Sequence, residues 1–113
     1  YQQIAQMLED GILRGEYPEE SQVPSTNELA KLYAINPATA AKGVNILVDE
    51  GILYKKRGIG MFVATGAKKQ IMEKRKKNFY DDYVKSLMAE ARSLGITRQE
   101  LIAMIQEAEN ERE

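Results

Sequence analysis

Residues 24–40 read PSTNELAKLYAINPATA, and this stretch decides the fold. Ser25 and Glu28 have the spacing of a capping box, in which each side chain accepts a hydrogen bond from the other residue's backbone amide. Asn36 and Pro37 mark a second helix start, because asparagine is a good cap and proline suits the first helical position. Two short helices separated by a few residues are typical of a helix-turn-helix, which we therefore predict here.

The second helix of this motif is predicted over about residues 37–50, because Gly51 is a typical stop just after a helix. Apolar residues recur on one of its faces at positions Ala40, Val44, Leu47 and Val48. Small or polar residues occupy other positions, namely Ala38, Thr39, Ala41, Lys42 and Asn45. A helix of this kind suits the major groove of DNA, which is about 12 Å wide.

The flanking segments predict a first helix and a β-hairpin. Ile4, Leu8 and Ile12 share one helical face over about residues 1–14. Residues 52–56 and 61–64 have the character of two strands, and the tip between them carries Arg57 and two glycines. A hairpin directly after a helix-turn-helix is typical of the wing of a winged helix. Taken alone, the segment would favour an ordinary surface hairpin with solvated lysines, and its place after the helix-turn-helix favours the wing instead.

Two amphipathic helices are predicted after Ala67. Apolar residues recur at three- and four-residue spacing at Ile71, Met72, Phe79, Tyr80, Tyr83, Val84, Leu87, Met88 and Ala91. After a break at residues 93–96, a second capping box at Thr97 and Glu100 opens a last helix. Because two helices cannot bury two apolar faces well by themselves, we expect pairing with a second copy, at roughly 25 cal/mol per Å² of apolar area removed from water. The expected contact residues are Phe79, Tyr80, Tyr83, Val84, Leu87, Met88, Leu101, Ile102 and Ile105.

Charge is balanced over the 113 residues, with a net charge of −1, but residues 68–77 are strongly basic. This segment holds Lys68, Lys69, Lys74, Arg75, Lys76 and Lys77 against Glu73 alone. Three interpretations stay open: an extension of a phosphate-binding surface, a solvated helix face, or a basic amphipathic helix on a membrane surface.

The composition excludes several classes of chemistry. Cysteine and histidine are absent, which removes disulfides, thiol nucleophiles, His-based acid–base catalysis and most zinc sites. No apolar run approaches the roughly 20 residues of a membrane span, and the first residues have no signal-peptide pattern. We expect a cytoplasmic, non-enzymatic protein without a cofactor or metal.

The motifs together resemble a known family over residues 1–64. They are Ile4-Ala5, Leu8, Ile12 and Gly15, then Pro24-Ser25-x-x-Glu28-Leu29-Ala30, then Thr39, Leu47 and Glu50-Gly51, then Gly58-x-Gly60-x-Phe62-Val63. This order resembles the DNA-binding domain of GntR-type bacterial transcription regulators. Residues 35–39 and 54–63, together with the short helical tail, resemble the YtrA subgroup, whose reduced C-terminal region serves for dimerisation.

The resemblance implies a mainly α fold with a small β-hairpin. It implies a winged helix-turn-helix DNA-binding domain over residues 1–65 and a two-helix dimerisation domain over residues 66–113. Such a protein would be a homodimeric, sequence-specific transcription regulator, most often a repressor, on a palindromic operator. The recognition helix, about residues 37–50, would enter the major groove, and the wing, residues 54–63, would lie on the backbone or in the minor groove.

Contacts to DNA are implied at Ser25, Asn27, Asn36, Pro37, Ala38, Thr39, Ala41, Lys42, Arg57 and Gly58. Lys55 and Lys56 are suited to phosphates by their charge. The family usually has arginines at the positions of Asn27, Pro37 and Ala41, so the operators of its better-known branches do not transfer to this chain. Asn36 could serve as a helix cap, as a base contact, or as both.

The sequence does not identify a small-molecule effector. A small-molecule effector would need a pocket at the dimer interface, where Tyr80, Tyr83, Met88 and Met104 could line it or merely pack. Two other functions compete with DNA binding: a winged helix that docks on a protein, and attachment to a membrane surface.

Overall fold

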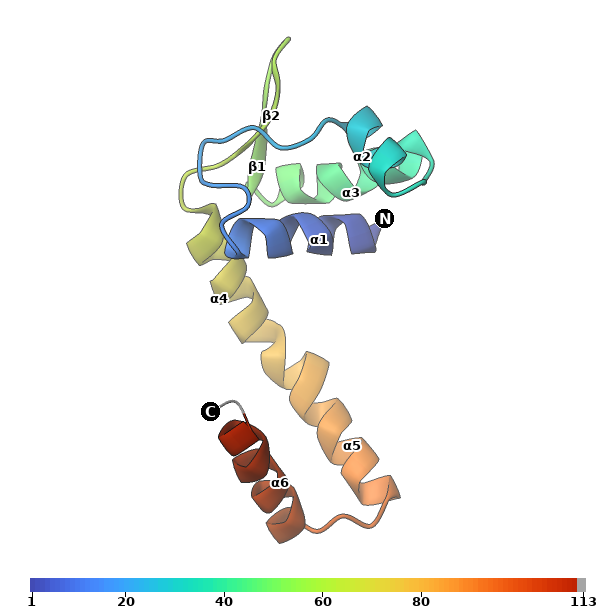
Figure 1. Cartoon of the computed structure of the whole chain (residues 1–113), viewed down its shortest axis with the longest axis vertical. Coiled ribbons are helices and arrows are strands. Elements are labelled where there is room, and N and C mark those ends of the chain that lie inside the picture. The colour runs from blue at the N-terminus through green and yellow to red at the C-terminus, as the bar shows by residue number, and fades with distance from the viewer. Residues whose placement is uncertain (112–113) are drawn as a thin grey trace. The chain divides into compact units, whose positions relative to one another are not determined.

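The computed structural model describes residues 1–111, which fold as a chain of helices interrupted by one β-hairpin (Figure 1). The elements are α1 (Gln2–Leu13), α2 (Thr26–Leu32), α3 (Pro37–Asp49), β1 (Leu53–Lys56), β2 (Gly60–Val63), α4 (Ala67–Phe79), the π-helical segment η1 (Tyr80–Val84), α5 (Lys85–Ser93) and α6 (Arg98–Glu111). The chain divides into two compact units, Tyr1–Lys74 and the part from Arg75 on. The predicted fold class, a winged helix-turn-helix followed by C-terminal helices, is confirmed.

The predicted helix starts are all present with their hydrogen bonds. At α2 the Glu28 amide donates to Ser25 Oγ at 3.1 Å, and the Ser25 amide donates to Glu28 Oε1 at 2.9 Å. At α3 the Ala38 amide donates to Asn36 Oδ1 at 2.8 Å, with Pro37 in the first turn. These bonds satisfy amides that a helix start otherwise leaves unpaired, so local sequence determines where α2 and α3 begin.

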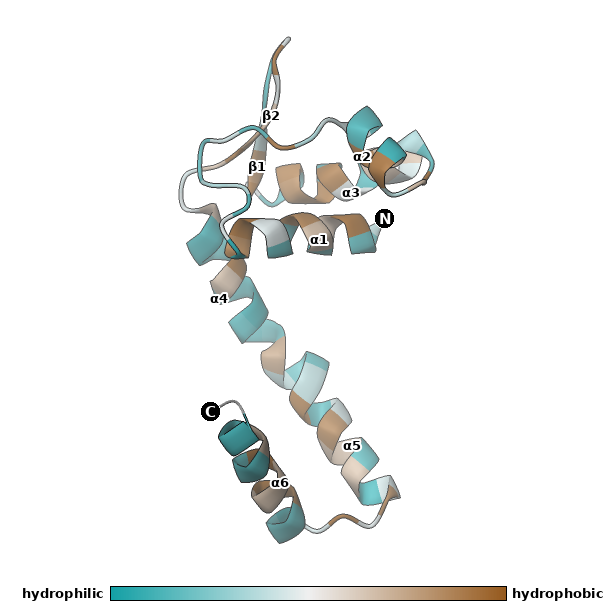
Figure 2. Ribbon diagram, in the orientation of Figure 1, coloured by the Kyte–Doolittle hydropathy of each residue, from teal (hydrophilic) through white to brown (hydrophobic). Residues whose placement is uncertain are grey.

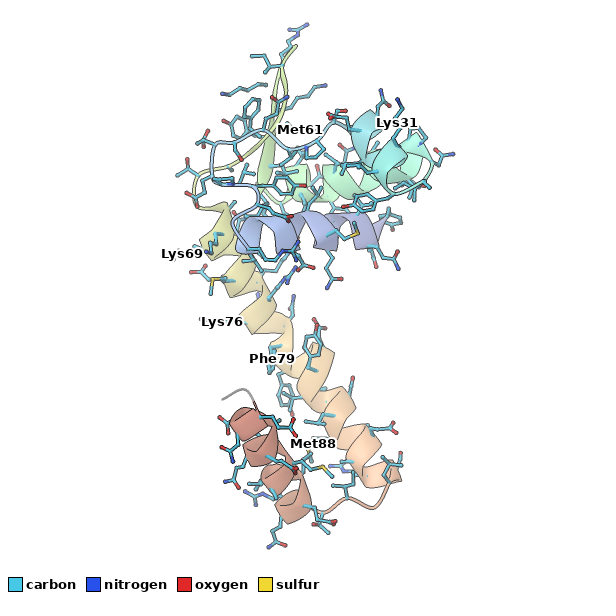
Figure 3. The ribbon with its side chains drawn as sticks, viewed as in Figure 1. Lys31, Met61, Lys69, Lys76, Phe79 and Met88 are labelled. Atoms are coloured by element: carbon cyan, nitrogen blue, oxygen red, sulfur yellow. The ribbon has the colours of Figure 1, made fainter. Side chains whose placement is uncertain are left out.

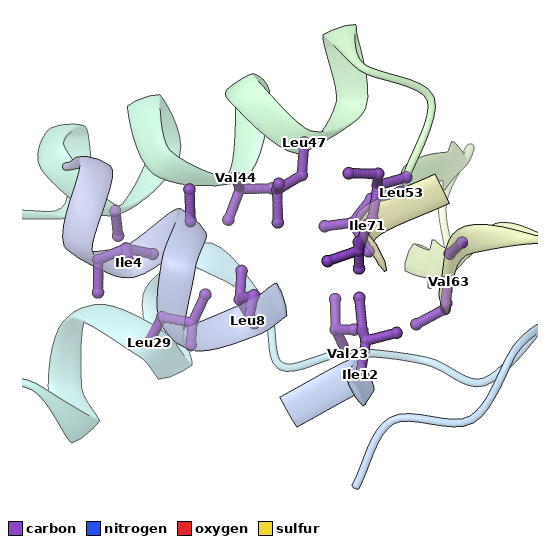
Figure 4. Packing of buried hydrophobic residues seen from close by; sticks show 14 of the residues in the cluster. Ile4, Leu8, Ile12, Val23, Leu29, Val44, Leu47, Leu53, Val63 and Ile71 are labelled. Carbon is purple, nitrogen blue, oxygen red and sulfur yellow. The ribbon is translucent and has the colours of Figure 1, made fainter. Parts of the chain in front are cut away.

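The core of the first unit lies between α1, α2, α3 and the base of the hairpin (Figure 4). Leu29, Leu47 and Leu53 are among its most completely buried side chains. Helices α1 and α3 approach closely at Gly43, where a Cβ atom would lie 2.7 Å from the carbonyl oxygen of Tyr1 and 2.8 Å from Ile4 Cβ. Any larger residue at Gly43 would therefore push α3 away from α1.

The burial of three apolar residues depends on where their helices end or begin. Leu32 and Tyr33, which follow the buried Leu29 and Ala30, are exposed, because α2 ends there and the chain turns toward α3. Ile71, predicted on the apolar face of the C-terminal helices, is fully buried in the core of the first unit. The first turns of α4 thus complete the winged helix, and its compact unit continues to Lys74.

The hairpin pairs β1 with β2 in antiparallel register, with Tyr54 opposite Phe62. Backbone bonds from residues 20–23 cover the other edge of β2: the Glu20 amide donates to the Val63 oxygen at 2.7 Å, and the Val23 amide to the Met61 oxygen at 2.9 Å. The loop before α2 therefore supports the wing as a third, strand-like segment at its base.

The second unit consists of the end of α4, then η1, α5 and α6. The one long helix predicted over residues 67–91 contains the π-helical turn η1, which the periodicity did not predict. Figure 2 shows α4 as largely hydrophilic, whereas apolar residues recur along α5 and α6. Ala91 is buried, and the Ile96 amide donates to its carbonyl oxygen at 2.9 Å.

Candidate nucleic-acid interface

Helix α3 presents a continuous exposed face opposite its buried one. Ala40, Val44 and Leu47 point into the core, because their spacing places them on one side of the helix. Ala38 and Lys42 are exposed on the other side, with Thr39 and Ala41 partly buried at its edges.

Asn45 lies three residues beyond Lys42 and is also exposed, so it extends the same face. The face thus offers methyl groups, an amide and one ammonium, which are groups that can meet base edges and phosphates. The ammonium of Lys42 lies 5.6 Å from the centroid of the Tyr1 ring, which limits the directions in which this side chain extends.

The predicted contact residues at the helix starts also have structural tasks. Ser25 Oγ accepts the bond of the capping box, but its hydroxyl hydrogen is still able to donate to a phosphate. Asn36 uses its side-chain oxygen as the cap of α3. Asn27 is exposed on the first turn of α2, and Pro37 is exposed on the first turn of α3.

The wing carries the densest group of cations in the first unit outside α4. Lys55, Lys56 and Arg57 follow one another along the end of β1 and into the turn, and all three are exposed. The Lys56 ammonium lies 4.3 Å from the Phe62 ring centroid and 5.9 Å from that of Tyr54, whose rings stack at 6.0 Å. Cation and rings therefore order each other on one face of the hairpin.

A carboxylate fastens the base of the wing. Glu20 accepts hydrogen bonds from the Thr65 hydroxyl, at 2.5 Å, and from the Tyr54 hydroxyl. These two bonds, the Thr65 bond first, hold the pKa of Glu20 below its ordinary value. The bond to Glu20 raises the pKa of the Tyr54 phenol. Glu20 thus links the loop before α2 to β1 and to the residue after the wing.

One member of the basic segment 68–77 has an internal role. The Lys74 ammonium forms ion pairs with Glu9 on α1 and with Glu50 at the end of α3, the latter at 3.0 Å. Burial opposes the charge on Lys74, but the bonds to Glu9 and Glu50 outweigh it and raise the lysine pKa. Gln70 also donates to the Glu50 carbonyl oxygen.

Part of the basic segment 68–77 therefore stabilises the fold, while other residues of it face solvent. Lys74 holds α4 to the winged helix, whereas Lys69 and Lys76 are exposed (Figure 3). Figure 1 shows the first turns of α4 at the end of α1, on the side of the first unit away from the wing tip.

The expected dimer residues of the second unit are mostly exposed. They are Phe79, Tyr80, Tyr83, Leu87, Met88, Ile102 and Ile105, with Val84 and Leu101 partly buried. The Phe79 and Tyr83 rings contact each other at a centroid distance of 5.4 Å across the π-helical turn. Single exposed apolar residues are ordinary, but a group of this size on two short helices is a candidate interaction surface.

Three notable residues of the wing and its support were not predicted from the sequence: Glu20, Gln22 and Ile59. Glu20 fastens the wing from outside the hairpin, Gln22 donates to the carbonyl oxygen of Ile59 at 2.9 Å, and Ile59 stands exposed at the wing tip. The first two act over 34 residues or more of sequence, which no local pattern indicates. For Ile59 the only signal was an apolar residue between two glycines.

The described residues contain a small cavity and no metal-binding group. A cavity of about 170 Å³ lies beside α1, lined by Ile4, Met7, Leu8, Asp10, Arg14, Glu16, Tyr17, Leu29 and Tyr33. This volume is below the roughly 300–1,000 Å³ of typical small-molecule sites. Residues 1–111 contain no group of acidic side chains placed to hold a metal, and none of their helices is long and apolar enough to cross a membrane.

Comparisons with known proteins agree with this geometry. The family model described as "Bacterial regulatory proteins, gntR family" matches residues 1–63. The HTH-type transcriptional repressor YtrA of Bacillus subtilis (strain 168) is 31% identical over 107 residues, which are 95% of this chain and 82% of YtrA. Several other curated relatives are matched over less than a third of their own length.

Solved structures extend the likeness to the whole chain. The crystal structure of a putative transcriptional regulator of the GntR family from Bacteroides thetaiotaomicron has a TM-score of 0.76 at 38% identity, covering 98% of this chain and 96% of that chain. BusR of S. agalactiae, solved in complex with its busA-promotor DNA, has a TM-score of 0.64 at 27% identity and covers 97% of this chain but only 52% of BusR.

Proposed function

The chain belongs to the GntR family of bacterial regulatory proteins and is a DNA-binding transcription regulator, and from this premise we propose that it is a repressor that binds a palindromic operator as a homodimer. In this proposal α3 enters the major groove and the wing contacts the phosphates and the adjacent minor groove. It acts where bacterial chromosomal DNA lies, in the cytoplasm, and it catalyses no reaction.

The exposed face of α3 beside the basic wing carries this proposal. Lys42 and Asn45 lie on a helix whose other face is fully occupied by the core, so their side chains are available to a partner. Lys55, Lys56 and Arg57 add three positive charges to a first unit whose helices are otherwise not basic up to α4. Phosphate contacts by such cations would position the protein, while α3 reads base edges.

The side chains at the start of α3 are suited to different contacts with DNA. Thr39 and the amide nitrogen of Asn36 can donate to phosphates or base edges. Ala38 and Ala41 suit the methyl groups of thymine. Because the arginines that usually stand at the positions of Asn27, Pro37 and Ala41 are absent, we expect an operator in which guanine contacts matter less.

Dimer formation is supported by the apolar residues of the second unit. Phe79, Tyr83 and Leu87 are exposed, and a second copy of the same surface would remove them from water. A two-fold dimer would present two α3 helices to half-sites about one helical turn apart. A small-molecule effector, if the regulator uses one, would bind at this interface, since the cavity of the first unit is small.

Selection of bound sequences from a random duplex pool, repeated at two salt concentrations, tests the proposal. We expect enrichment of a palindrome whose half-sites are the same at both salts. Retention of duplexes without enrichment, lost as salt rises, would reduce the function to non-specific binding by the basic wing. If no duplex is retained, a winged helix that docks on a protein is favoured. If a separate assay shows that the protein binds anionic vesicles in preference to DNA, attachment to a membrane surface is favoured.

A further inference from the structure

The tip of the wing carries an exposed aliphatic side chain. Ile59 is 63% exposed and stands between Gly58 and Gly60 in the turn that joins β1 to β2. Both glycines have positive φ angles, 77° and 142°, so the turn bends tightly and leaves Ile59 as the side chain at its end. An isoleucine in this position contributes nothing to the core.

The backbone of Ile59 is held on both sides. Its amide donates to the Lys56 carbonyl oxygen at 3.0 Å, and its own carbonyl oxygen accepts a bond from Gln22 Nε2 at 2.9 Å. Gln22 lies against Gly60 so closely that a Cβ atom there would stand 2.5 Å from Nε2. With both backbone groups already hydrogen-bonded inside the protein, the exposed side chain is the main part of Ile59 that is available to a partner.

The surroundings of Ile59 favour nucleic acid as that partner. Lys55, Lys56 and Arg57 precede it directly, so the tip is an apolar group on a cationic stem. Each strand of the hairpin has four residues, and a strand rises about 3.3 Å per residue, so the tip extends about 13 Å from the end of the core. With α3 in the major groove, as proposed, a reach of this length would take the tip past one phosphate backbone toward the neighbouring minor groove.

We propose that Ile59 enters the minor groove and discriminates against G·C base pairs there; this inference rests on the proposed function. The minor groove shows acceptors at every base pair, but only G·C adds the N2 amino group of guanine. An aliphatic side chain cannot accept a hydrogen bond from that amino group and excludes the water that would, so G·C is penalised. Apolar wedges of this kind are a recurrent device of minor-groove recognition.

Inosine provides a sharp test, because an inosine·cytosine pair lacks the N2 amino group. It resembles A·T in the minor groove and G·C in the major groove. Each A·T pair of the selected operator is replaced, one at a time, by G·C and by inosine·cytosine, and binding is measured by fluorescence anisotropy. At a pair read by Ile59, the inosine duplex should bind like A·T, while G·C should bind about fivefold or more weakly, the lower bound for a mismatched base pair. At a pair read by α3, inosine should behave like G·C.

Ile59→Ala should remove this discrimination at the same pairs and leave the α3-read pairs unchanged. Because Ile59 is exposed, the substitution removes no core contact, and circular dichroism verifies the fold. The matched control is Lys55→Ala, which should weaken binding to all duplexes alike and reduce the slope of log K against log salt by about one per subunit.

Two results would overturn the inference. One is that the protein binds the inosine·cytosine and G·C duplexes equally well at every position, and the other is that the Ile59→Ala variant still distinguishes them. In either case the protein would still bind its operator, and only the proposed role of Ile59 would be rejected. If no duplex is enriched in the selection, the proposed function fails first, and the role of Ile59 fails with it.

Discussion

At Asn36 one side chain combines a structural task with an available polar group. Its oxygen accepts the Ala38 amide and caps α3, while its nitrogen is left for a phosphate or a base edge. Ser25 has the same double character, since its oxygen completes a capping box and its hydroxyl can still donate. The residues that start the two helices of the motif therefore keep a donor that the proposed DNA contacts can use.

Thr39 and Lys42 are the residues of α3 whose loss should affect DNA binding most directly. Replacing both by alanine should weaken operator binding by about 1–3 kcal/mol, the cost of a lost base contact. Because a lysine is also lost, the dependence of log K on log salt should become less steep. Dimer formation and unfolding should not change, because neither side chain belongs to the core. Anisotropy titrations at several salt concentrations measure the effect.

The matched control for this variant is Lys69→Ala, which removes one exposed lysine from α4. Its effect on operator affinity should be much smaller. Equal losses in the two variants would mean that the operator responds to overall charge and that α3 is not the reading helix.

At the scale of elements, two polar connections hold the winged helix in shape. Glu20 fastens the wing to the loop before α2, and Lys74 fastens α4 to α1 and to the end of α3. Both connect residues far apart in the sequence, so neither was predictable from local patterns. The caps of α2 and α3 were predictable, because a cap is formed within four residues of the chain.

Lys74→Met should lower the free energy of unfolding by about 1–3 kcal/mol, since it removes the ammonium that pairs with the 6%-exposed Glu9 and with Glu50. Adding Glu9→Gln should recover part of this loss, because the buried charge is then gone. Urea unfolding of both single variants and the double variant forms a thermodynamic cycle. Strictly additive losses would contradict an ion pair between these residues.

Glu20 makes the stability of the wing depend on acid. Because its pKa is held below the ordinary value of 4.5, its contribution is fully present above pH 4.5 and is lost as the pH falls through the lowered folded value. The stability difference between the wild type and Glu20→Gln should therefore be largest near neutral pH and should shrink below pH 4.5. Urea unfolding across this range measures it, and a difference that grows on acidification would contradict the assignment.

The C-terminal helices illustrate what a periodic pattern cannot decide. Apolar spacing over residues 67–91 indicated one continuous face, but Ile71 packs in the core of the first unit and a π-helical turn follows at Tyr80–Val84. A π turn contains an extra residue, so positions before and after it no longer share a face. The spacing of apolar residues alone predicts neither the position of a π-helical turn nor the core in which an apolar side chain is buried.

At the scale of the whole molecule, the proposed recognition of a palindromic operator requires two copies of the chain. Tyr83 is 61% exposed in the second unit and contacts the Phe79 ring, in the middle of the surface expected to pair. Tyr83→Asp should therefore yield a monomer in analytical ultracentrifugation and lower operator affinity through the loss of bivalency, by about a hundredfold or more. The affinity for a single half-site should stay unchanged.

The matched control is Asn78→Asp, which adds the same single negative charge at an exposed polar position of α4, outside the expected contact residues. It should leave the dimer intact. A dimeric Tyr83→Asp protein would mean that the copies pair through another surface.

The fold of the first unit followed well from local sequence, whereas the proposed dimer and DNA contacts concern surfaces whose partners lie outside the chain.

Site-directed DNA cleavage tests the central claim most directly, that two copies place α3 and the wing on the two halves of one operator. The chain contains no cysteine, so Asn45→Cys on α3 and Ile59→Cys at the wing tip can each carry a single iron–EDTA group. We predict two cleavage clusters per variant, symmetric about the centre of the operator, with the wing clusters displaced from the α3 clusters by about five base pairs, half a helical turn. Cleavage on one side only, or at the same positions from both labels, would contradict the account.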